Sequence, residues 1–280
     1  REDERAFAAR LVEIVERRSV RVVLAGAPHV AHVLARHAKV LARAGAKLLG
    51  SEPEALARLR EKGLAVVGRG ARIATVPAVE VPAQPTVASF LSAAAWPIAL
   101  LADDGARRRA SDAIEALNAT RALYARGARH VRRTSPAFRR LFEVLLVVAR
   151  DGRLLGACAV RVLEDDERMR PWIAVTVDDV RLERAAHAVA ARCALRGPVT
   201  VTLQADGEGF VALDAQPGLP VWIEACLREG PNLVALCVAA TLDARARPAG
   251  RVPAGTLFSQ TAQDVVLDPR SSAAAAILTA

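Results

Sequence analysis

Residues 198–217 read PVTVTLQADGEGFVALDAQP, two apolar segments joined by a Gly-containing turn. This pattern predicts a β-hairpin. Its second strand ends in Asp214, Ala215, Gln216 and Pro217. Residues two apart on a strand face the same side of the sheet. Asp214 and Gln216 therefore either hold a Mg²⁺ ion together or simply end a strand before a proline turn.

A second hairpin is predicted at residues 141–164, with Asp151 and Gly152 in its turn. Apolar periodicity and end signals predict helices at 3–18, 29–45, 52–63, 86–95, 110–127, 178–197 and 221–243, the last broken near Gly230. Other strands are predicted at 20–28, 46–51 and 96–104, and an extended connector at 71–85. The order predicts a small parallel α/β lobe, then a larger α+β lobe of hairpins packed on helices.

The composition favours a globular protein with a sizeable core. Its 280 residues correspond to about two domains, and 52% of them are hydrophobic. The formal net charge is +9, and only three of the 39 basic residues are lysines. The arginines are scattered among acidic residues without interleaved aromatic side chains, a pattern that argues against nucleic-acid binding. The positive net charge still allows a polyanion other than nucleic acid as a ligand.

The cysteine pattern bears on the cellular compartment. The four cysteines lie in apolar segments without CxxC spacing: Cys158, Cys193, Cys226 and Cys237. Such cysteines are typical of buried free thiols in a reducing compartment. No apolar run approaches the ~18 residues of a membrane span, and no signal peptide is visible. We expect a cytoplasmic protein without membrane contact and, because the chain starts at Arg1, a piece of a longer protein.

Four stretches between residues 10 and 243 are informative through their sequence and their order along the chain. They are LARAGAKLLGSEPEALARLREK, WPIALLADDG, FEVLLVVARDG and RGPVTVTLQADGEGFVALDAQPG. The last is similar to a closing hairpin that ends in Glu-x-Asn-Pro-Arg, and the third to a strand that opens with Glu and ends in Arg-Asp-Gly. Together the four resemble the ATP-grasp superfamily, most closely the ATP-binding half-domains of the carbamoyl-phosphate synthase large chain.

This resemblance implies an ATP-grasp fold preceded by a partial Rossmann-like (pre-ATP-grasp) lobe. The partial lobe would cover residues 1–51, the ATP-grasp domain residues 52–243 in subdomains of about 52–127 and 128–243, and a linker and tail residues 244–280. The resemblance also implies ATP and Mg²⁺ as cofactors, an acid as small-molecule substrate, and an acyl-phosphate that an amine attacks. A protein partner or homo-oligomer is implied as well.

The implied phosphate contacts are only partly present. The first basic position falls on Lys62, which is retained, but the second falls on Leu101, which cannot neutralise a phosphate. The Gly-rich loop is replaced by DDGARRRASD, residues 103–112, which has a single glycine.

That replacement segment has two interpretations. Arg107, Arg108 and Arg109 could contact phosphates in place of the loop. The interpretation that we favour is that the segment forms a solvated turn that caps the next helix, with Ser111 or Asp112 near the N-cap.

The implied nucleotide and metal ligands are altered too. Glu143 corresponds to a Glu that contacts the nucleotide near its sugar, or else marks a strand edge at the surface. Asp214 and Gln216 replace the metal-binding Glu and Asn, and each oxygen is displaced by one methylene, which matters to octahedral Mg²⁺. The register of the first metal ligand on strand 199–204 stays open among Val201, Thr202 and Gln204.

Three hypotheses follow. The one we favour is an ATP-grasp protein with an eroded nucleotide and Mg²⁺ site, a weak ATP binder or a non-catalytic scaffold or regulatory domain of a ligase-like system. The second is an active ATP-dependent carboxylate–amine ligase that uses Arg107, Arg108 and Arg109 on phosphates, with Mg²⁺ on Asp214 and Gln216. The third is an α/β module for a polyanion.

Overall fold

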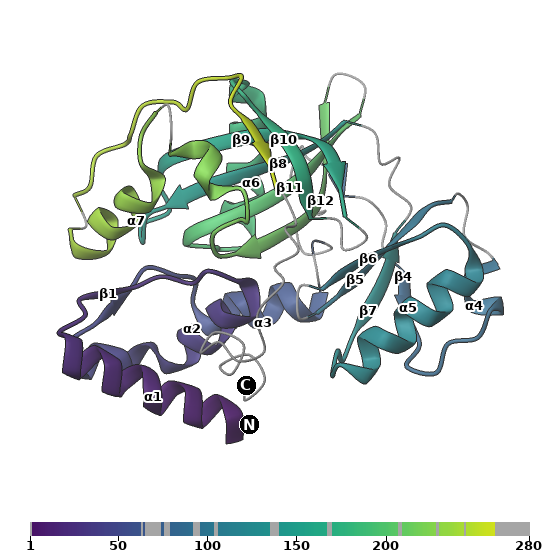
Figure 1. Ribbon diagram of the computed structural model, residues 1–280, viewed down its shortest axis with the longest axis horizontal. Helices are drawn as coiled ribbons and strands as arrows, with labels where there is room; N and C mark the ends of the chain where they lie inside the picture. Colours follow the sequence, from purple (N-terminus) through teal and green to yellow (C-terminus); the bar gives the residue numbers. More distant parts are fainter. Residues whose placement is uncertain are drawn as a thin grey trace, which may run out of the picture.

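The computed structural model describes residues 2–62, 64, 74–75, 79–91, 96–103, 106–134, 140–166, 170–206, 209–227, 230–243 and 245–260. Within them lie an N-terminal α/β part, a four-stranded sheet and a seven-stranded sheet (Figure 1). This arrangement confirms the predicted α/β start followed by a larger α+β region. No helix in these ranges is long and apolar enough to cross a membrane.

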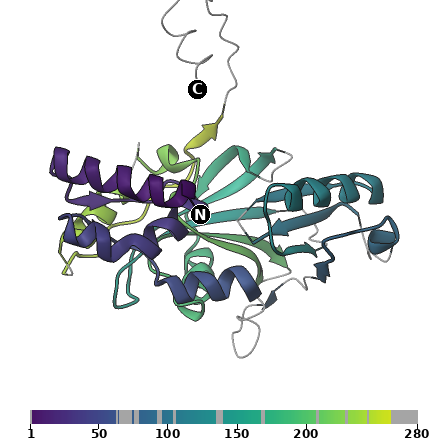
Figure 2. The same cartoon turned by 90° about the horizontal axis from the view of Figure 1, so that it is seen from below.

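The N-terminal part consists of α1 (Glu2–Arg18), β1 (Val22–Val23), α2 (Pro28–Arg43), β2 (Lys47–Leu48) and α3 (Pro53–Lys62). β1 and β2 pair in parallel, and helix residues such as Val15, Leu34 and Leu41 fill the core beneath them. Figure 2 shows α1 and α2 side by side on this face of the molecule. Both strands are much shorter than predicted, because the residues after them turn to the seven-stranded sheet: Leu219 donates its backbone N–H to the Ala25 carbonyl (3.2 Å).

The four-stranded sheet has the order β4-β7-β5-β6, and its strand pairs are antiparallel. Its elements are β4 (Val79–Val81), α4 (Ala88–Leu91), β5 (Ile98–Ala102), β6 (Arg107–Ala110), α5 (Ala113–Ala125) and β7 (Val131–Thr134). The two helices cover one face, where Phe90, Ile98 and Leu123 are buried. Neither β6 nor β7 is predicted by the sequence, since their arginine-rich segments lack apolar alternation.

The seven-stranded sheet has the order β13-β10-β9-β8-β11-β12-β3. Its strands are β3 (Ala74–Thr75), β8 (Leu141–Val148), β9 (Leu154–Asp165), β10 (Pro171–Val177), β11 (Gly197–Asp206), β12 (Gly209–Pro217) and β13 (Leu257–Ser259). Both predicted hairpins are confirmed, as β8–β9 and β11–β12. In the first turn Gly152 has a φ of +93°, a conformation that glycine adopts without strain.

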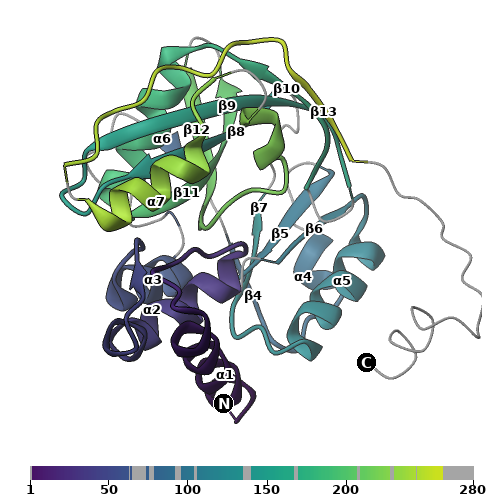
Figure 3. The ribbon, with the colours of Figure 1, turned by 60° about the vertical axis from the view of Figure 1, so that its left-hand side comes forward.

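Helices cover both faces of this sheet (Figure 3). One face packs on α6 (Val180–Arg192), the other on the 3₁₀ helix η2 (Ile223–Cys226) and on α7 (Leu233–Leu242). The break predicted near Gly230 falls between η2 and α7. With helices on both sides, β8 is a near-continuous apolar strand, and Glu143 is the exception within it.

Candidate functional site

Three polar side chains form a row across the middle of the seven-stranded sheet. Thr202 on β11 lies opposite Glu143 on β8 and also opposite Asp214 on β12. Residues directly opposite each other in antiparallel strands share a face, so the three side chains are neighbours. The register of β12 shifts by one residue between the pairs Thr202–Asp214 and Leu203–Ala212. Such a bulge re-aims the strand end.

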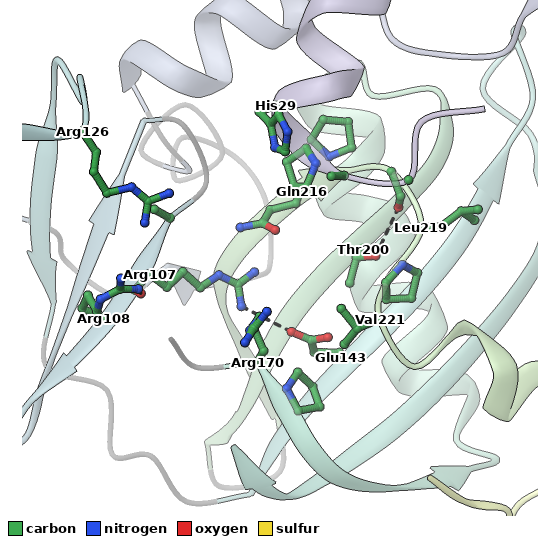
Figure 4. A pocket seen from close by; sticks show the side chains of 18 residues that line it. His29, Arg107, Arg108, Arg126, Glu143, Arg170, Thr200, Gln216, Leu219 and Val221 are labelled. Carbon is green, nitrogen blue, oxygen red and sulfur yellow. Dashed lines mark hydrogen bonds and ion pairs between the residues drawn. The ribbon is translucent and has the colours of Figure 1, made fainter. Parts of the chain in front are cut away.

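A guanidinium group from the other sheet lies against this row. Arg107 on β6 has Nη2 at 2.9 Å and Nε at 3.0 Å from Oδ2 of Asp214, and Nη1 at 3.3 Å from Oε1 of Glu143. Figure 4 shows the Arg107 side chain reaching from the four-stranded sheet toward Glu143. One cation is therefore shared by two carboxylates that are 71 residues apart in the chain.

This ion triad is largely removed from water. Arg107 is only 7% exposed and Glu143 6%. Burial acts to lower the pKa of Arg107, but the charges of Asp214 and Glu143 outweigh it and raise the pKa above its ordinary value. A buried ion pair gains attraction but loses hydration, so removing one partner is costly because the other stays behind unpaired.

Glu143 is held from a third direction as well. The indole N–H of Trp222 donates to its Oε2 at 2.7 Å, and the Thr202 hydroxyl donates to its Oε1 at 3.4 Å. Because β8 is the fourth of seven strands and Glu143 is buried, the alternative of a strand edge at the surface is wrong. The lone acid in this apolar strand belongs to a polar network between the sheets.

The arginine-rich segment 107–110 is not the solvated turn that we preferred. It forms strand β6, and Arg107 and Arg109 point to the same side, where Arg109 pairs with Asp165 at the end of β9. Arg108 donates to the carbonyl of Arg107 at 2.9 Å. Ion pairs with the other sheet therefore stabilise residues 107–110 as a strand, although their sequence has no apolar alternation. The expected cap holds, since Asp112 accepts from the N–H groups of Ile114 and Glu115.

The two positions implied to contact phosphate are Lys62 and Leu101, and Leu101 lies beside Arg107 of the triad. Lys62 is the last residue of α3, and its side chain is outside the described part of the chain. Leu101 on β5 lies opposite Arg107 on β6 and Arg132 on β7, so arginines flank the position where a basic residue is missing. The strand pattern thus places positive charge beside Leu101 without restoring it there.

Next to the triad lies a pocket of about 580 Å³ between the three parts of the molecule. Its walls are the first turn of α2, the end of β12 with the segment after it, and arginines of the four-stranded part (Figure 4). The ionisable lining residues are His29, Arg107, Arg108, Arg126, Glu143 and Arg170. The sequence singled out neither Arg126 nor Arg170, because an isolated surface arginine in an arginine-rich chain carries no distinguishing signal.

Three solved structures are similar to this arrangement. Biotin carboxylase of Campylobacter jejuni in its β-γ-ATP complex aligns with a TM-score of 0.64 and 16% identity, over 84% of this chain and 57% of that chain. The biotin carboxylase domain of Hydrogenobacter thermophilus 2-oxoglutarate carboxylase, with MgADP, ADP and bicarbonate, gives 0.65 and 15%, over 86% and 57%. D-alanine–D-alanine ligase of Bacillus anthracis with ATP gives 0.53 and 12%, over 73% and 74%.

All three are ATP-grasp proteins. This chain has the ATP-grasp fold. It spans 57% of the length of the two biotin carboxylases, so the activities of the whole relatives do not transfer with the fold. No family model and no curated protein matches the sequence. The ATP-grasp resemblance seen in the sequence is thus confirmed as a fold, while its narrower form, a likeness to carbamoyl-phosphate synthase, stays a prediction.

The side-chain atoms at the end of β12 that would bind Mg²⁺, as the ATP-grasp resemblance implies, are already engaged in hydrogen bonds. Asp214 Oδ2 accepts from Arg107 and from the side-chain amide of Gln216 (2.8 Å), and Oδ1 accepts from the N–H of Ala215 (2.8 Å). Gln216 therefore presents its NH₂ group, not its oxygen, to the shared site. In the described ranges no three His, Cys, Asp or Glu side chains gather closely enough to hold a metal ion.

One acid of the replaced loop also has structural partners. Asp103 is buried and accepts from the backbone N–H groups of Arg129 (3.0 Å) and His130 (3.4 Å), with Arg60 at 3.7 Å. Asp104 and Gly105 fall outside the described residues. Asp103 thus connects the end of β5 to the residues that precede β7.

Proposed function

We propose that this ATP-grasp-fold protein is a weak nucleotide binder without ligase chemistry of its own, acting as a scaffold or regulatory domain of a ligase-like system. One observation carries the proposal: the guanidinium of Arg107 contacts both Asp214 and Glu143, at 2.9 and 3.3 Å. A permanent side-chain cation therefore occupies the place in which a catalytic site would need an exchangeable metal.

Electrostatics supports this proposal. At an effective dielectric constant of about 20, a Mg²⁺ ion about 4 Å from the guanidinium would meet roughly 8 kcal/mol of repulsion, which offsets much of its attraction to the two carboxylates. To admit the ion, the Arg107 guanidinium would have to move away from its two carboxylates. Because Arg107 is buried, this movement would have to displace the packed side chains around it. Mg²⁺ also demands near-ideal octahedral oxygen geometry, whereas Gln216 directs its amide nitrogen to Asp214.

The phosphate-binding side of the site supports the same conclusion. Leu101 stands at the second basic position, and a hydrophobic side chain forgoes a charge-assisted bond of roughly 1.5–3 kcal/mol. Arg107, the first candidate to replace it, already has two carboxylate partners, and Arg109 pairs with Asp165. Two of the three arginines that could contact phosphates therefore hold the sheets together.

The test is calorimetric titration of Mg²⁺–ATP into the protein, repeated with excess EDTA and with the Asp214→Ala variant. We expect a dissociation constant above about 1 mM in each titration. Submillimolar binding that requires Mg²⁺ and disappears in Asp214→Ala would overturn the proposal. That result would support the alternative, an ATP-dependent carboxylate–amine ligase, which the ATP complexes of the similar structures favour.

A further inference from the structure

A second hollow of the surface lies where α1, α2 and α3 meet the segment before β7. It has a volume of about 550 Å³, and most of its lining is basic: Glu4, Arg5, Arg36, His37, Arg60 and Arg129. A pocket of about 300 Å³ between α2 and α3 adjoins it, since Arg36 and Arg60 line both. We call the two together the arginine groove. Its described lining shares no residue with the pocket beside the triad and none with the seven-stranded sheet.

The arginine groove has more positive charge than its own acids balance. Arg60 has Asp103 at 3.7 Å, which is longer than a hydrogen bond, and that carboxylate also accepts from two backbone N–H groups. Within the described part of the chain, no carboxylate lies within 4 Å of the guanidinium of Arg5 or Arg129. Both residues are exposed, so both charges are accessible from solvent.

One carboxylate of the protein already lies in the groove. Arg36 donates from Nε to Oε1 of Glu4 and from Nη2 to Oε2, both at 2.8 Å, and Nε2 of His37 lies 3.3 Å from Oε1. This two-pronged contact is the geometry in which a guanidinium binds a carboxylate most strongly. The hydrogen bond from Arg36 lowers the pKa of Glu4, although burial opposes it. Glu4 thus shows how the groove accommodates a carboxylate.

The arrangement of the other basic groups suits several carboxylates in a row. Arg5, Arg60 and Arg129 come from α1, from α3 and from the segment before β7, so they reach the groove from three directions. In Figure 2 the N-terminal end of α1, which carries Arg5, points toward the four-stranded part. A small anion would engage only some of these groups. An extended peptide presents every second side chain on one side, about 7 Å apart, and can engage them all.

The uncharged lining favours a peptide as well. Pro53, Leu56 and Ala57 contribute an apolar wall between α2 and α3, which suits the aliphatic side chains of a peptide. Single-stranded nucleic acid stacks its bases on aromatic side chains. The described residues of the groove include no Phe, Trp or Tyr side chain for that purpose.

We propose that the arginine groove is a docking surface for an acidic peptide segment of a partner protein, bound in an extended conformation. Arg5 and Arg129 bind carboxylates of the segment directly, and Arg36 binds one when Glu4 moves aside. The inference goes beyond the proposed function and is independent of it, because the groove needs neither a nucleotide nor a metal ion.

The test is the fluorescence anisotropy of a dye-labelled peptide of about ten residues that alternates glutamate with alanine, at about 50 mM salt. We expect a dissociation constant below about 1 mM, which rises with ionic strength because exposed ion pairs are screened. A peptide that alternates glutamine with alanine should not bind. Citrate and a single-stranded oligonucleotide of the same charge serve as competitors. If either displaced the peptide at the peptide's own concentration, the groove would be a small-anion or general polyanion site and the proposal would be wrong.

The double variant Arg5→Gln/Arg129→Gln should weaken peptide binding about fivefold or more, since two direct contacts are lost. Its matched control is Arg43→Gln/Arg121→Gln, which also removes one exposed arginine from the N-terminal part and one from the four-stranded part, but outside the groove. The control should stay within about twofold of the unaltered protein, because distant exposed charges are largely screened.

Glu4→Gln should change the affinity in the opposite direction. It removes the internal carboxylate from Arg36, so we expect the peptide to bind about threefold more tightly. Glu13→Gln makes the same charge change on α1, where Glu13 pairs with Arg10 outside the groove, and should leave the affinity unchanged. The inference fails if the peptide does not bind, if the two double variants are weakened equally, or if Glu4→Gln and Glu13→Gln bind alike. These titrations contain no nucleotide and no Mg²⁺, so their result is separate from that of the Mg²⁺–ATP titration.

Discussion

Gly197 lies directly against the backbone of Leu49: a Cβ atom on this glycine would come within 2.5 Å of the Leu49 carbonyl oxygen. The residue has a φ of +80° and opens β11. The neighbouring Arg196 donates its N–H to the hydroxyl of Ser51 at 2.8 Å. Through these contacts the N-terminal part docks closely on the start of β11, by a backbone approach at Gly197 and by the Ser51 hydroxyl at Arg196.

We expect Gly197→Ala to lower the free energy of unfolding by about 3 kcal/mol or more, since the methyl group must push two backbone segments apart in addition to the strain of positive φ. The matched control is Gly45→Ala, where φ is +103° but nothing lies within 4 Å; it should cost about 1 kcal/mol. Urea denaturation measures both. Equal losses in the two variants would contradict a close backbone approach.

The ion triad gives a second prediction. Arg107→Met should destabilise the protein by about 3 kcal/mol, because it leaves Glu143 and Asp214 without their cation. Arg108→Met, which loses only a bond to a backbone carbonyl, should cost less than about 1 kcal/mol.

Adding Glu143→Gln and Asp214→Asn to Arg107→Met should restore much of the loss, as the remaining groups are then neutral. Urea denaturation of the triple variant decides this point. If it were no more stable than Arg107→Met alone, the loss would reflect packing and not charge.

His32 should make the stability of the folded protein depend on pH. Burial, with the charges of Arg60 and Arg36, lowers the pKa of His32 from 6.5 to about 4. The unfolded chain therefore binds a proton more readily, so stability is highest above about pH 6.5 and falls as the pH drops toward about 4.

We expect a loss of about 1 kcal/mol between about pH 7 and pH 5, allowing for the solvent that still reaches the ring. Thermal denaturation of His32→Gln should show a smaller loss over the same interval. His29→Gln, at an exposed position of the same helix, should keep the loss of the unaltered protein. Identical pH profiles for all three proteins would refute the assignment to His32.

The four cysteines are free and buried, as the sequence predicted. Burial raises the pKa of Cys193 to about 11 and that of Cys237 to about 12, so very little thiolate exists near neutral pH. In a colorimetric thiol titration at neutral pH, less than about one cysteine per chain should react in the native protein, and about four should react in urea. Fast reaction of a native thiol would show that one of these sites is open to solvent.

The sequence predicted elements whose signal is local. The Asp151-Gly152 turn between two apolar segments was sufficient for the β8–β9 hairpin, and Asp112 marked the start of α5. β6 was missed because its residues are stabilised by partners on another sheet: Arg109 by Asp165, and Arg107 by Glu143 and Asp214. Such pairing follows from tertiary placement and leaves no periodicity in the strand's own sequence.

The candidate site shows the same limit. Asp214 and Glu143 stood out in the sequence because each is an acid in an apolar strand, but their common partner could not be inferred. The one-residue bulge in β12 decides that Asp214 lies opposite Thr202, and that register stayed open until the strand pairs were known. Trp222, which binds Glu143, lies 79 residues further along the chain and carries no motif.

Strand β6 places Arg107 and Arg109 on one side, where together they contact carboxylates on β8, β9 and β12. Separating the two sheets would uncover all five charges in one step, so we expect the gap between them to open abruptly, without partly opened forms. Salt favours uncovered charges. The width of that gap, followed by small-angle scattering, should therefore respond to ionic strength and stay indifferent to chelators.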